Sequence, residues 1–206
     1  MPRTFIKVYM VFVVAFIFSI CCPCSVQTSW ADLASAEAAF FRGDYAAAFK
    51  EFNRLAQDGS AEAQFSLGNL FYMGRGVQQS YAQAAKWYRK AADQGYMFAQ
   101  ASLGVMYEKG QGFSRDYVQA IKWYRRAADQ GDTKAQLNLG ILYYFGDGVP
   151  QDYVQAYVWF NLSAEQGEEI AIESREQVRR LMTPEQIAEA QRLSNEWKPK
   201  KERNQP

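Results

Sequence analysis

The chain has 206 residues, and its 23 lysines and arginines nearly balance its 22 aspartates and glutamates. It contains no histidine, and its three cysteines, Cys21, Cys22 and Cys24, lie close to the N-terminus. The charge balance argues against a nucleic-acid partner, because such proteins carry a basic surface. Beyond Cys24 the usual zinc ligands, the neutral-pH proton shuttle and the thiol nucleophile are missing. We therefore expect no metal, no cofactor and no catalytic site.

Residues 1–31 have the layout of a secretory signal peptide. Arg3 and Lys7 precede an uncharged apolar run over residues 8–22, and small residues follow at Ser29 and Ala31. We expect cleavage after Ala31, which makes the mature protein periplasmic or secreted and free of cysteine.

Two alternatives for this leader remain open. The apolar run is shorter than the roughly 18 residues of a spanning helix, but an uncleaved leader would be the chain's one contact with a membrane. A lipoprotein is disfavoured by the bulky Ile20 before Cys21.

Residues 32–59 predict a helical hairpin that serves as an N-terminal cap. The turn falls in the segment 38–45, and Asp44 is suited to N-cap the second helix.

Three units with a period of 36 residues follow, over 60–95, 96–131 and 132–167, and the period is the clearest signal in the sequence. Three tryptophans and four series of glycines keep this register: Trp87, Trp123, Trp159; Gly59, Gly95, Gly131, Gly167; Gly68, Gly104, Gly140; Gly74, Gly110, Gly146; Gly76, Gly112, Gly148.

Each unit predicts two helices joined by a G-x-G turn. In the first unit Ala63, Leu67 and Phe71 form one apolar stripe, and Gly68 lies mid-helix, where a glycine is explained by a close neighbour. The second helices begin at the N-cap residues Ser80, Asp116 and Asp152 and end at the glycines 95, 131 and 167. We expect the tryptophan N–H groups to find buried partners. Stacked hairpins of this kind predict an all-α, right-handed superhelical solenoid.

Residues 168–206 predict a C-terminal helical cap and tail. Thr183 to Gln186 form a capping box with proline at the first helical position, and the helix is expected to run to about Trp197. We expect the residues from Lys198 onward to be disordered.

The repeats resemble the Sel-one-like repeat (SLR) family, a relative of tetratricopeptide repeats. The motif reads A-x-x-x-L-G-x-x-(Y/F), G-x-G-V, D-Y-x-x-A-x-x-W-Y, A-A-x-x-G, and the central copy fills it from Ala99 to Gly131 with Phe113 in place of the valine. The hairpin 32–59 lacks the G-x-G insertion and is similar to a plain tetratricopeptide hairpin. The resemblance implies a non-catalytic scaffold or adaptor that binds another protein or peptide.

An enzyme or ligand-binding function is the first alternative, because some relatives are linked with β-lactam binding or hydrolysis. No Ser-x-x-Lys or Lys-Thr-Gly motif is present. The acid–base candidates Glu168–Glu169 and Glu185/Glu189 are typical of solvated helix surfaces. The G-x-G turns join helix to helix and lack a phosphate-loop context. The second alternative is self-association through the C-terminal helices.

In tetratricopeptide-like hairpins the first helix lines a concave groove. Carrying those positions over predicts a partner-binding groove more apolar than a solvated face. Its residues are Phe65, Asn69, Tyr72, Met73, Phe98, Val105, Glu108, Lys109, Leu137, Ile141, Tyr144 and Phe145.

Overall fold

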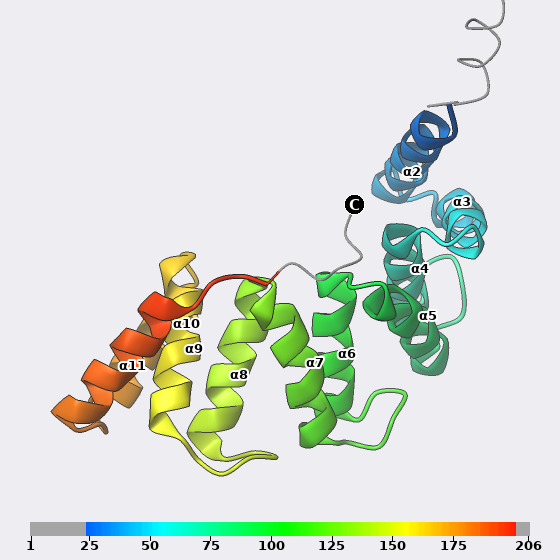
Figure 1. The fold of residues 1–206 in the computed structure, drawn as a ribbon. Helices are drawn as coiled ribbons and strands as arrows, with labels where there is room; N and C mark the ends of the chain where they lie inside the picture. Colours follow the sequence, from blue (N-terminus) through cyan, green and yellow to red (C-terminus); the bar gives the residue numbers. More distant parts are fainter. Residues whose placement is uncertain (1–23, 201–206) are drawn as a thin grey trace, which may run out of the picture.

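A computed structural model describes residues 24–200, and all regular secondary structure in that range is helical. Figure 1 shows the helices stacked along an arc, with α2 and α3 at one end and α10 and α11 at the other. The helices are α2 (Cys24–Phe41), α3 (Tyr45–Gln57), α4 (Ala61–Met73), α5 (Tyr81–Asp93), α6 (Met97–Lys109), α7 (Tyr117–Asp129), α8 (Thr133–Phe145), α9 (Tyr153–Glu165), α10 (Glu169–Arg179) and α11 (Pro184–Glu196).

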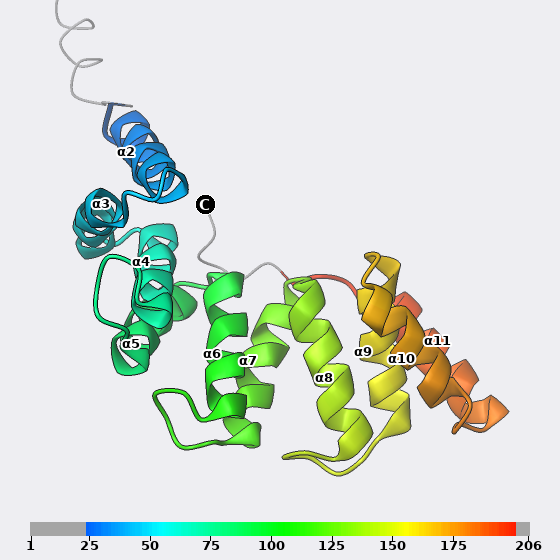
Figure 2. The ribbon, with the colours of Figure 1, turned by 180° about the vertical axis from the view of Figure 1, so that it is seen from behind.

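Consecutive helices pair as hairpins, which makes the molecule a solenoid of the predicted class. We call α2, α4, α6, α8 and α10 the A helices, and α3, α5, α7 and α9 the B helices. Figure 2 views the molecule from the side on which α6, α8 and α10 lie. Each B helix packs against the A helices before and after it, and α11 closes the array by packing against α9.

The predicted helix ends are confirmed. Asp44, Ser80, Asp116 and Asp152 each accept a hydrogen bond from a backbone N–H in the first turn of the helix that follows. After α5, Gly95 takes φ +93°, a left-handed conformation that glycine adopts without steric cost. Its N–H and that of Tyr96 bond back into the last turn of α5, which is a Schellman motif.

A close contact between each mid-helix glycine and an aromatic ring fixes the distance between the two helices of a hairpin. A Cβ built on Gly68 would lie 2.6 Å from the ring of Tyr88, and one on Gly104 would lie 2.5 Å from the ring of Tyr124. The third pair is Gly140 and Phe160, also at 2.5 Å. The expectation of a close neighbour is confirmed, and the neighbour is the aromatic residue directly after the repeated tryptophan.

Two series of glutamines join the hairpins into one stack. Gln64 donates from Nε2 to the carbonyl of Ala56, and its Oε1 accepts from Gln94 Nε2 at 2.8 Å. The same arrangement recurs at Gln100 with Gln130, where the distance is 2.7 Å. It recurs again at Gln136 with Gln166. Because the first glutamine of each pair is buried, losing either partner leaves a polar group unsatisfied at a cost of about 1–3 kcal/mol.

The expectation for the tryptophan N–H groups is wrong at two positions. Within residues 24–200, Nε1 of Trp123 and Nε1 of Trp159 are buried without a hydrogen-bond partner. The guanidinium of Arg89 instead lies 4.6 Å from the Trp123 ring centroid, and that of Arg125 lies 4.6 Å from Trp159. These cation–π contacts between successive hairpins use the ring face rather than the N–H.

The C-terminal helices agree with the prediction, but the tail differs from it in part. The capping box at Thr183 is present. Residues 198–200 are not disordered: the Lys200 backbone N–H donates to the carbonyl of Asp129 at 2.6 Å, and its Nζ lies 3.0 Å from the Asp129 carboxylate. This contact joins positions 71 residues apart, so local composition could not reveal it. Residues 201–206 and most of the expected leader, 1–23, lie outside the described residues.

Substituting Gly104 with alanine tests the contact that sets the hairpin spacing. Alanine favours a helix by about 1 kcal/mol, but its Cβ would overlap the Tyr124 ring. We expect a net loss of about 1–3 kcal/mol, the usual cost of overpacking a core. The measurement is urea unfolding followed by circular dichroism. A Tyr124→Leu background should shrink the penalty, whereas a G104A variant as stable as the wild type would contradict the contact's role.

Alkaline unfolding tests the burial of the two tyrosines. Burial raises the pKa of Tyr88 and of Tyr124 far above the usual value near 10, and the bond to Glu108 raises that of Tyr124 further. The unfolded chain therefore loses these protons first, and stability falls above pH ~10 by about 1.4 kcal/mol per pH unit for each tyrosine.

The Tyr88→Phe variant should show a slope smaller by about that amount between roughly pH 10 and 12. The double variant that also carries Tyr124→Phe should show a slope smaller by twice that amount. Urea unfolding at a series of pH values measures the slope, and unchanged slopes would show that these hydroxyls titrate freely.

Candidate interaction face

Nine of the twelve predicted groove residues lie in three rows that cross α4, α6 and α8. We call this surface, with its continuation onto α2 and α10, the A-helix face. The rows are Asn69, Val105, Ile141; Tyr72, Glu108, Tyr144; and Met73, Lys109, Phe145.

The other three predicted residues lie elsewhere on the A helices. Phe65 and Phe98 form an aromatic cluster with Tyr96, with ring centroids 5.3 Å apart for Phe65–Tyr96 and 5.5 Å for Tyr96–Phe98. Leu137 is only 8 % exposed and belongs to the core around α9, so its assignment to a binding surface is wrong. It was assigned by helix position alone, which does not reveal how closely the next helix packs.

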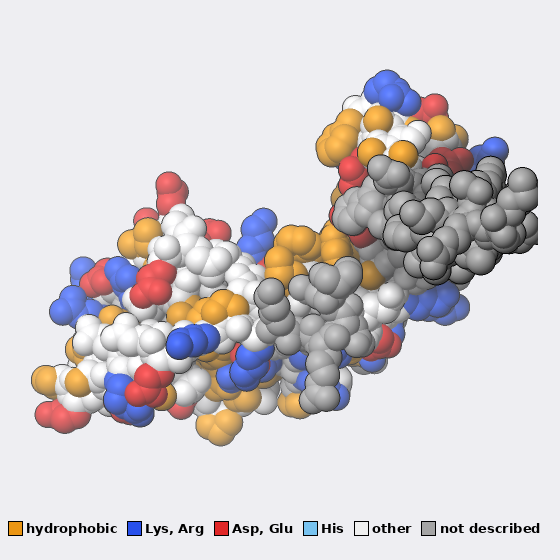
Figure 3. All heavy atoms as spheres, turned by 45° about the horizontal axis from the view of Figure 1, so that its top comes forward, with side chains coloured by type: hydrophobic (Ala, Val, Ile, Leu, Met, Phe, Trp, Pro, Cys, Tyr) orange, Lys and Arg blue, Asp and Glu red, His pale blue; other side chains and the backbone are white. Residues whose placement is uncertain are grey.

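Large apolar side chains are exposed along this face. Phe145 is 65 % exposed and Met73 47 %, and Phe98, which lies outside the three rows, is 46 % exposed. In Figure 3, which tilts the top of the Figure 1 view forward and so does not look onto the side seen in Figure 2, hydrophobic side chains also gather in the hollow between the two arms of the arc. The C-terminal helical segment also exposes Ile170, and Leu181 follows in the turn after α10.

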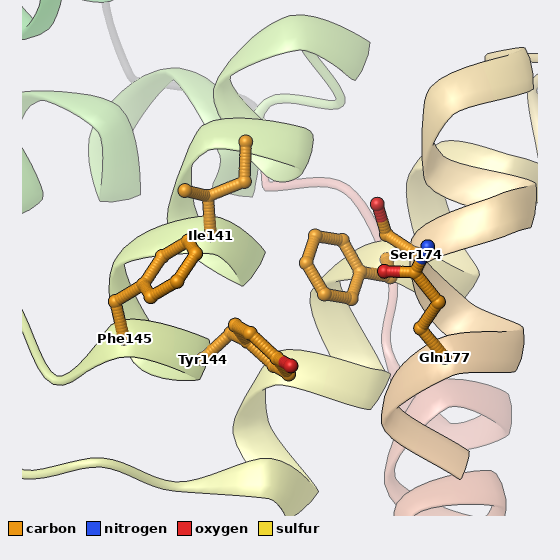
Figure 4. A pocket seen from close by; sticks show the side chains of 6 residues that line it. Ile141, Tyr144, Phe145, Ser174 and Gln177 are labelled. Carbon is orange, nitrogen blue, oxygen red and sulfur yellow. The ribbon is translucent and has the colours of Figure 1, made fainter. Parts of the chain in front are cut away.

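A pocket of about 250 Å³ opens between α8 and α10. Ile141, Tyr144 and Phe145 project from α8, and Ser174 and Gln177 face them from α10 (Figure 4). The ring of Phe160 on α9 forms the floor, and this residue is 2 % exposed. The lining is apolar on the α8 side and carries uncharged polar groups on the α10 side.

A second pocket, of about 140 Å³, opens between α2 and α4. Phe52 on α3 lines it and is 2 % exposed. The residues from the A helices are Glu37, Phe40, Phe41, Ser66 and Asn69. Except for Asn69, these residues were missed by sequence reasoning. They could have been found by aligning α2 with α4 from the helix ends rather than from the 36-residue period, because the turn after α2 is four residues shorter.

Between the two pockets, tyrosine hydroxyl groups fill the equivalent space. The Tyr88 hydroxyl donates to Asn69 Oδ1 at 2.6 Å, and the Tyr124 hydroxyl donates to Glu108 Oε2 at 2.5 Å. Tyr124 also bonds Asn138 on the next A helix. The middle of the A-helix face is therefore closed by hydrogen bonds at the places where the ends are open.

Acidic groups gather at the α2 end of the face. Burial raises the pKa of Glu62, and the nearby charge of Glu37 raises it further. Burial raises the pKa of Tyr96 to about 12, again with contributions from Glu62 and Glu37. Within residues 24–200 neither glutamate forms an ion pair. A cation lies close to this corner, since the guanidinium of Arg75 is 5.6 Å from the ring centroid of Phe40.

Two of the four glutamates weighed as acid–base candidates, Glu185 and Glu189, have surroundings that favour the ionised carboxylate. Backbone and Thr183 hydrogen bonds lower the pKa of Glu185, and the Arg192 guanidinium lowers that of Glu189. A general acid needs the opposite shift, and neither residue lines either of the two pockets described above. In the described part of the chain no group of histidine, cysteine or carboxylate side chains is arranged to hold a metal ion. None of the described helices is long and apolar enough to cross a membrane.

Comparison with solved structures finds the same repeat fold. A protective antigen present in uropathogenic Escherichia coli strains, which displays an SLR fold, is 36 % identical, with a TM-score of 0.68. The match covers 73 % of this chain and 32 % of that protein. A Sel1 repeat protein from Oxalobacter formigenes is 35 % identical, with a TM-score of 0.64, over 68 % of this chain and 56 % of that one. The chain thus spans about a third and about half of these two relatives.

The family comparison identifies the repeat itself. The Sel1 repeat pattern matches residues 61–96, 98–132 and 133–168. None of the curated proteins compared with the chain matches it. The matched repeats cover more than half of the sequence, and the chain therefore belongs to the Sel1 repeat family, whose members are typically protein-interaction scaffolds.

Proposed function

We propose that the A-helix face binds a segment of a partner protein and that the chain acts as a non-catalytic adaptor. The observation that carries the proposal is the exposed apolar side chains at the two ends of that face, with Phe145 65 % and Met73 47 % exposed and a pocket at each end. Soluble proteins rarely leave such a patch in water unless it binds something.

A protein segment fits this surface better than a small ligand. The pockets, of about 250 and 140 Å³, are smaller than the ~300–1,000 Å³ of usual small-molecule sites. They lie at opposite ends of the face, on α2–α4 and on α8–α10. An occupant that uses the whole face must therefore be elongated.

Export is part of the same proposal. Cleavage after Ala31 would shorten α2 but keep its buried residues Leu33, Ala36 and Ala39, together with the 2.6 Å ion pair between Asp32 and Arg54. The uropathogenic relative is a protective antigen, which is in keeping with a protein that leaves the cytoplasm.

N-terminal sequencing tests the leader. Protein expressed from the full sequence in a bacterial host should be recovered from the periplasm or the medium with Asp32 as its first residue. A chain that keeps Met1 and sediments with membranes would instead support the uncleaved anchor.

Site-specific photo-crosslinking in the producing cells tests the binding face. A benzophenone amino acid at position 145 or 73 should give discrete higher-mass adducts, because both side chains project into solvent from the A-helix face. A Tyr144→Ala change should weaken the adduct at 145 by about tenfold, as expected from removing an aromatic interface anchor.

Position 118 provides the matched control. Val118 is an apolar residue on the B helix α7 and is 60 % exposed, so the probe is equally accessible there. Adducts of the same masses from position 118, or none from 145 and 73, would remove the A-helix face as the binding surface.

A further inference from the structure

The two pockets are the same site of the repeat, formed twice. Three lining residues of the α8–α10 pocket lie 108 residues, three periods of 36, after their counterparts in the α2–α4 pocket. The pairs are Phe52 and Phe160, Ser66 and Ser174, and Asn69 and Gln177. The other three lining residues of the α8–α10 pocket lie 104 residues after their counterparts. These pairs are Glu37 and Ile141, Phe40 and Tyr144, and Phe41 and Phe145. The second spacing is four residues smaller because the turn after α2 is four residues shorter than the turns after α4, α6 and α8. Every lining residue of one pocket therefore has its counterpart in the other.

The state of each site follows from one aromatic position on the B helix. That position is Phe52, Tyr88, Tyr124 and Phe160 in successive hairpins. Where it is tyrosine, the hydroxyl bonds across to an A helix. Where it is phenylalanine, at both ends of the array, the hydroxyl is missing and a pocket opens above the ring.

We propose that the two end pockets receive two large apolar side chains of one extended protein segment, with a lysine or arginine beside the side chain in the α2–α4 pocket. This inference rests on the proposed function and specifies the partner's chemistry. The lining is mainly aromatic and aliphatic at α8–α10 and contains three phenylalanines at α2–α4, which suits an apolar anchor in each pocket. Glu37 lines the α2–α4 pocket, and Glu62 lies near it without a cationic partner in residues 24–200.

The spacing of the anchors follows from the geometry of the stack. The pockets are three A-helix steps apart, from α2–α4 to α8–α10. Successive A helices pack mainly on the B helix between them, so about 10 Å, the spacing of two directly packed helices, is a lower limit for each step, and the distance is at least roughly 30 Å. An extended chain advances about 3.3 Å per residue, so the two anchors should be separated by at least about nine residues.

Selection from a displayed library of random 16-residue peptides tests this directly, with the full chain as the target. Peptides retained should carry two large apolar residues at one constant spacing of at least about nine positions, with a basic residue next to the one for the α2–α4 pocket. Synthetic copies are then measured by fluorescence anisotropy against four variants: Phe52→Tyr, Phe160→Tyr, their double variant, and Phe113→Tyr. Each of the first two places in a pocket the hydroxyl that the middle hairpins already contain.

Phe52→Tyr or Phe160→Tyr should each weaken binding by about tenfold, since each excludes one buried anchor. The double variant should lose more than either single variant, because linked anchors reinforce each other. Phe113→Tyr adds the same hydroxyl to a ring stacked on Tyr107, outside both pockets, and should leave the affinity unchanged. Thermal unfolding of each variant establishes that the fold is intact.

The charge at the α2 end has its own test. Glu37→Gln should lower the affinity for peptides that carry the flanking lysine by several fold. The same peptides with glutamine in place of that lysine should bind both proteins equally.

The outcomes separate this inference from the proposed function. Peptides that lose affinity for a Met73→Asp variant but bind the double tyrosine variant as tightly as the wild type would overturn the two-pocket inference and leave the binding face in place. Peptides whose affinity is unchanged by all of these substitutions, or a selection that retains no peptide, would overturn both the two-pocket inference and the proposed binding face.

Discussion

The contact between an aromatic ring of a B helix and the bare backbone of an A helix governs the arrangement of the whole array. At Gly68, Gly104 and Gly140 no Cβ could be accommodated beneath the ring. The helices of a hairpin can therefore approach closely, and the ring is held with its far edge toward the A-helix face. Ala36 stands at the matching place in the first hairpin and is fully buried, so a small residue serves there too.

The same ring then decides the chemistry of the surface above it. A hydroxyl at its far edge reaches the A helix and closes the face, as Tyr88 does with Asn69. A plain phenyl ring leaves the space open, as Phe160 does between α8 and α10. One oxygen atom, set by the identity of one residue in each repeat, separates a structural interface from a candidate binding pocket.

The repeat could be predicted from the sequence because its packing is local and periodic. The glycine at Gly104 and the aromatic ring at Tyr124 recur in the same register in every unit, and N-caps such as Asp116 signal helix starts without any tertiary information.

The proposed binding surface was harder to predict from the sequence. Leu137 occupies an A-helix position like its neighbours, yet it is buried in the core around α9. The α2 pocket was missed because a turn shortened by four residues shifts Glu37 and Phe40 out of the 36-residue register.

The pockets lie at the two ends of the stack, where a solenoid is least supported, since a terminal repeat contacts a neighbour on one side only. The helix α10 shows this limit: it is 11 residues long and only Ala171 and Val178 are buried. A partner side chain between α8 and α10 would contact both helices and so stabilise the last interface by mass action. Because local opening has its lowest cost at such ends, binding there would order the helices that cap the core. Capping and recognition then depend on the same apolar contacts, which is a reason for the end hairpins to carry phenylalanine where the middle ones carry tyrosine.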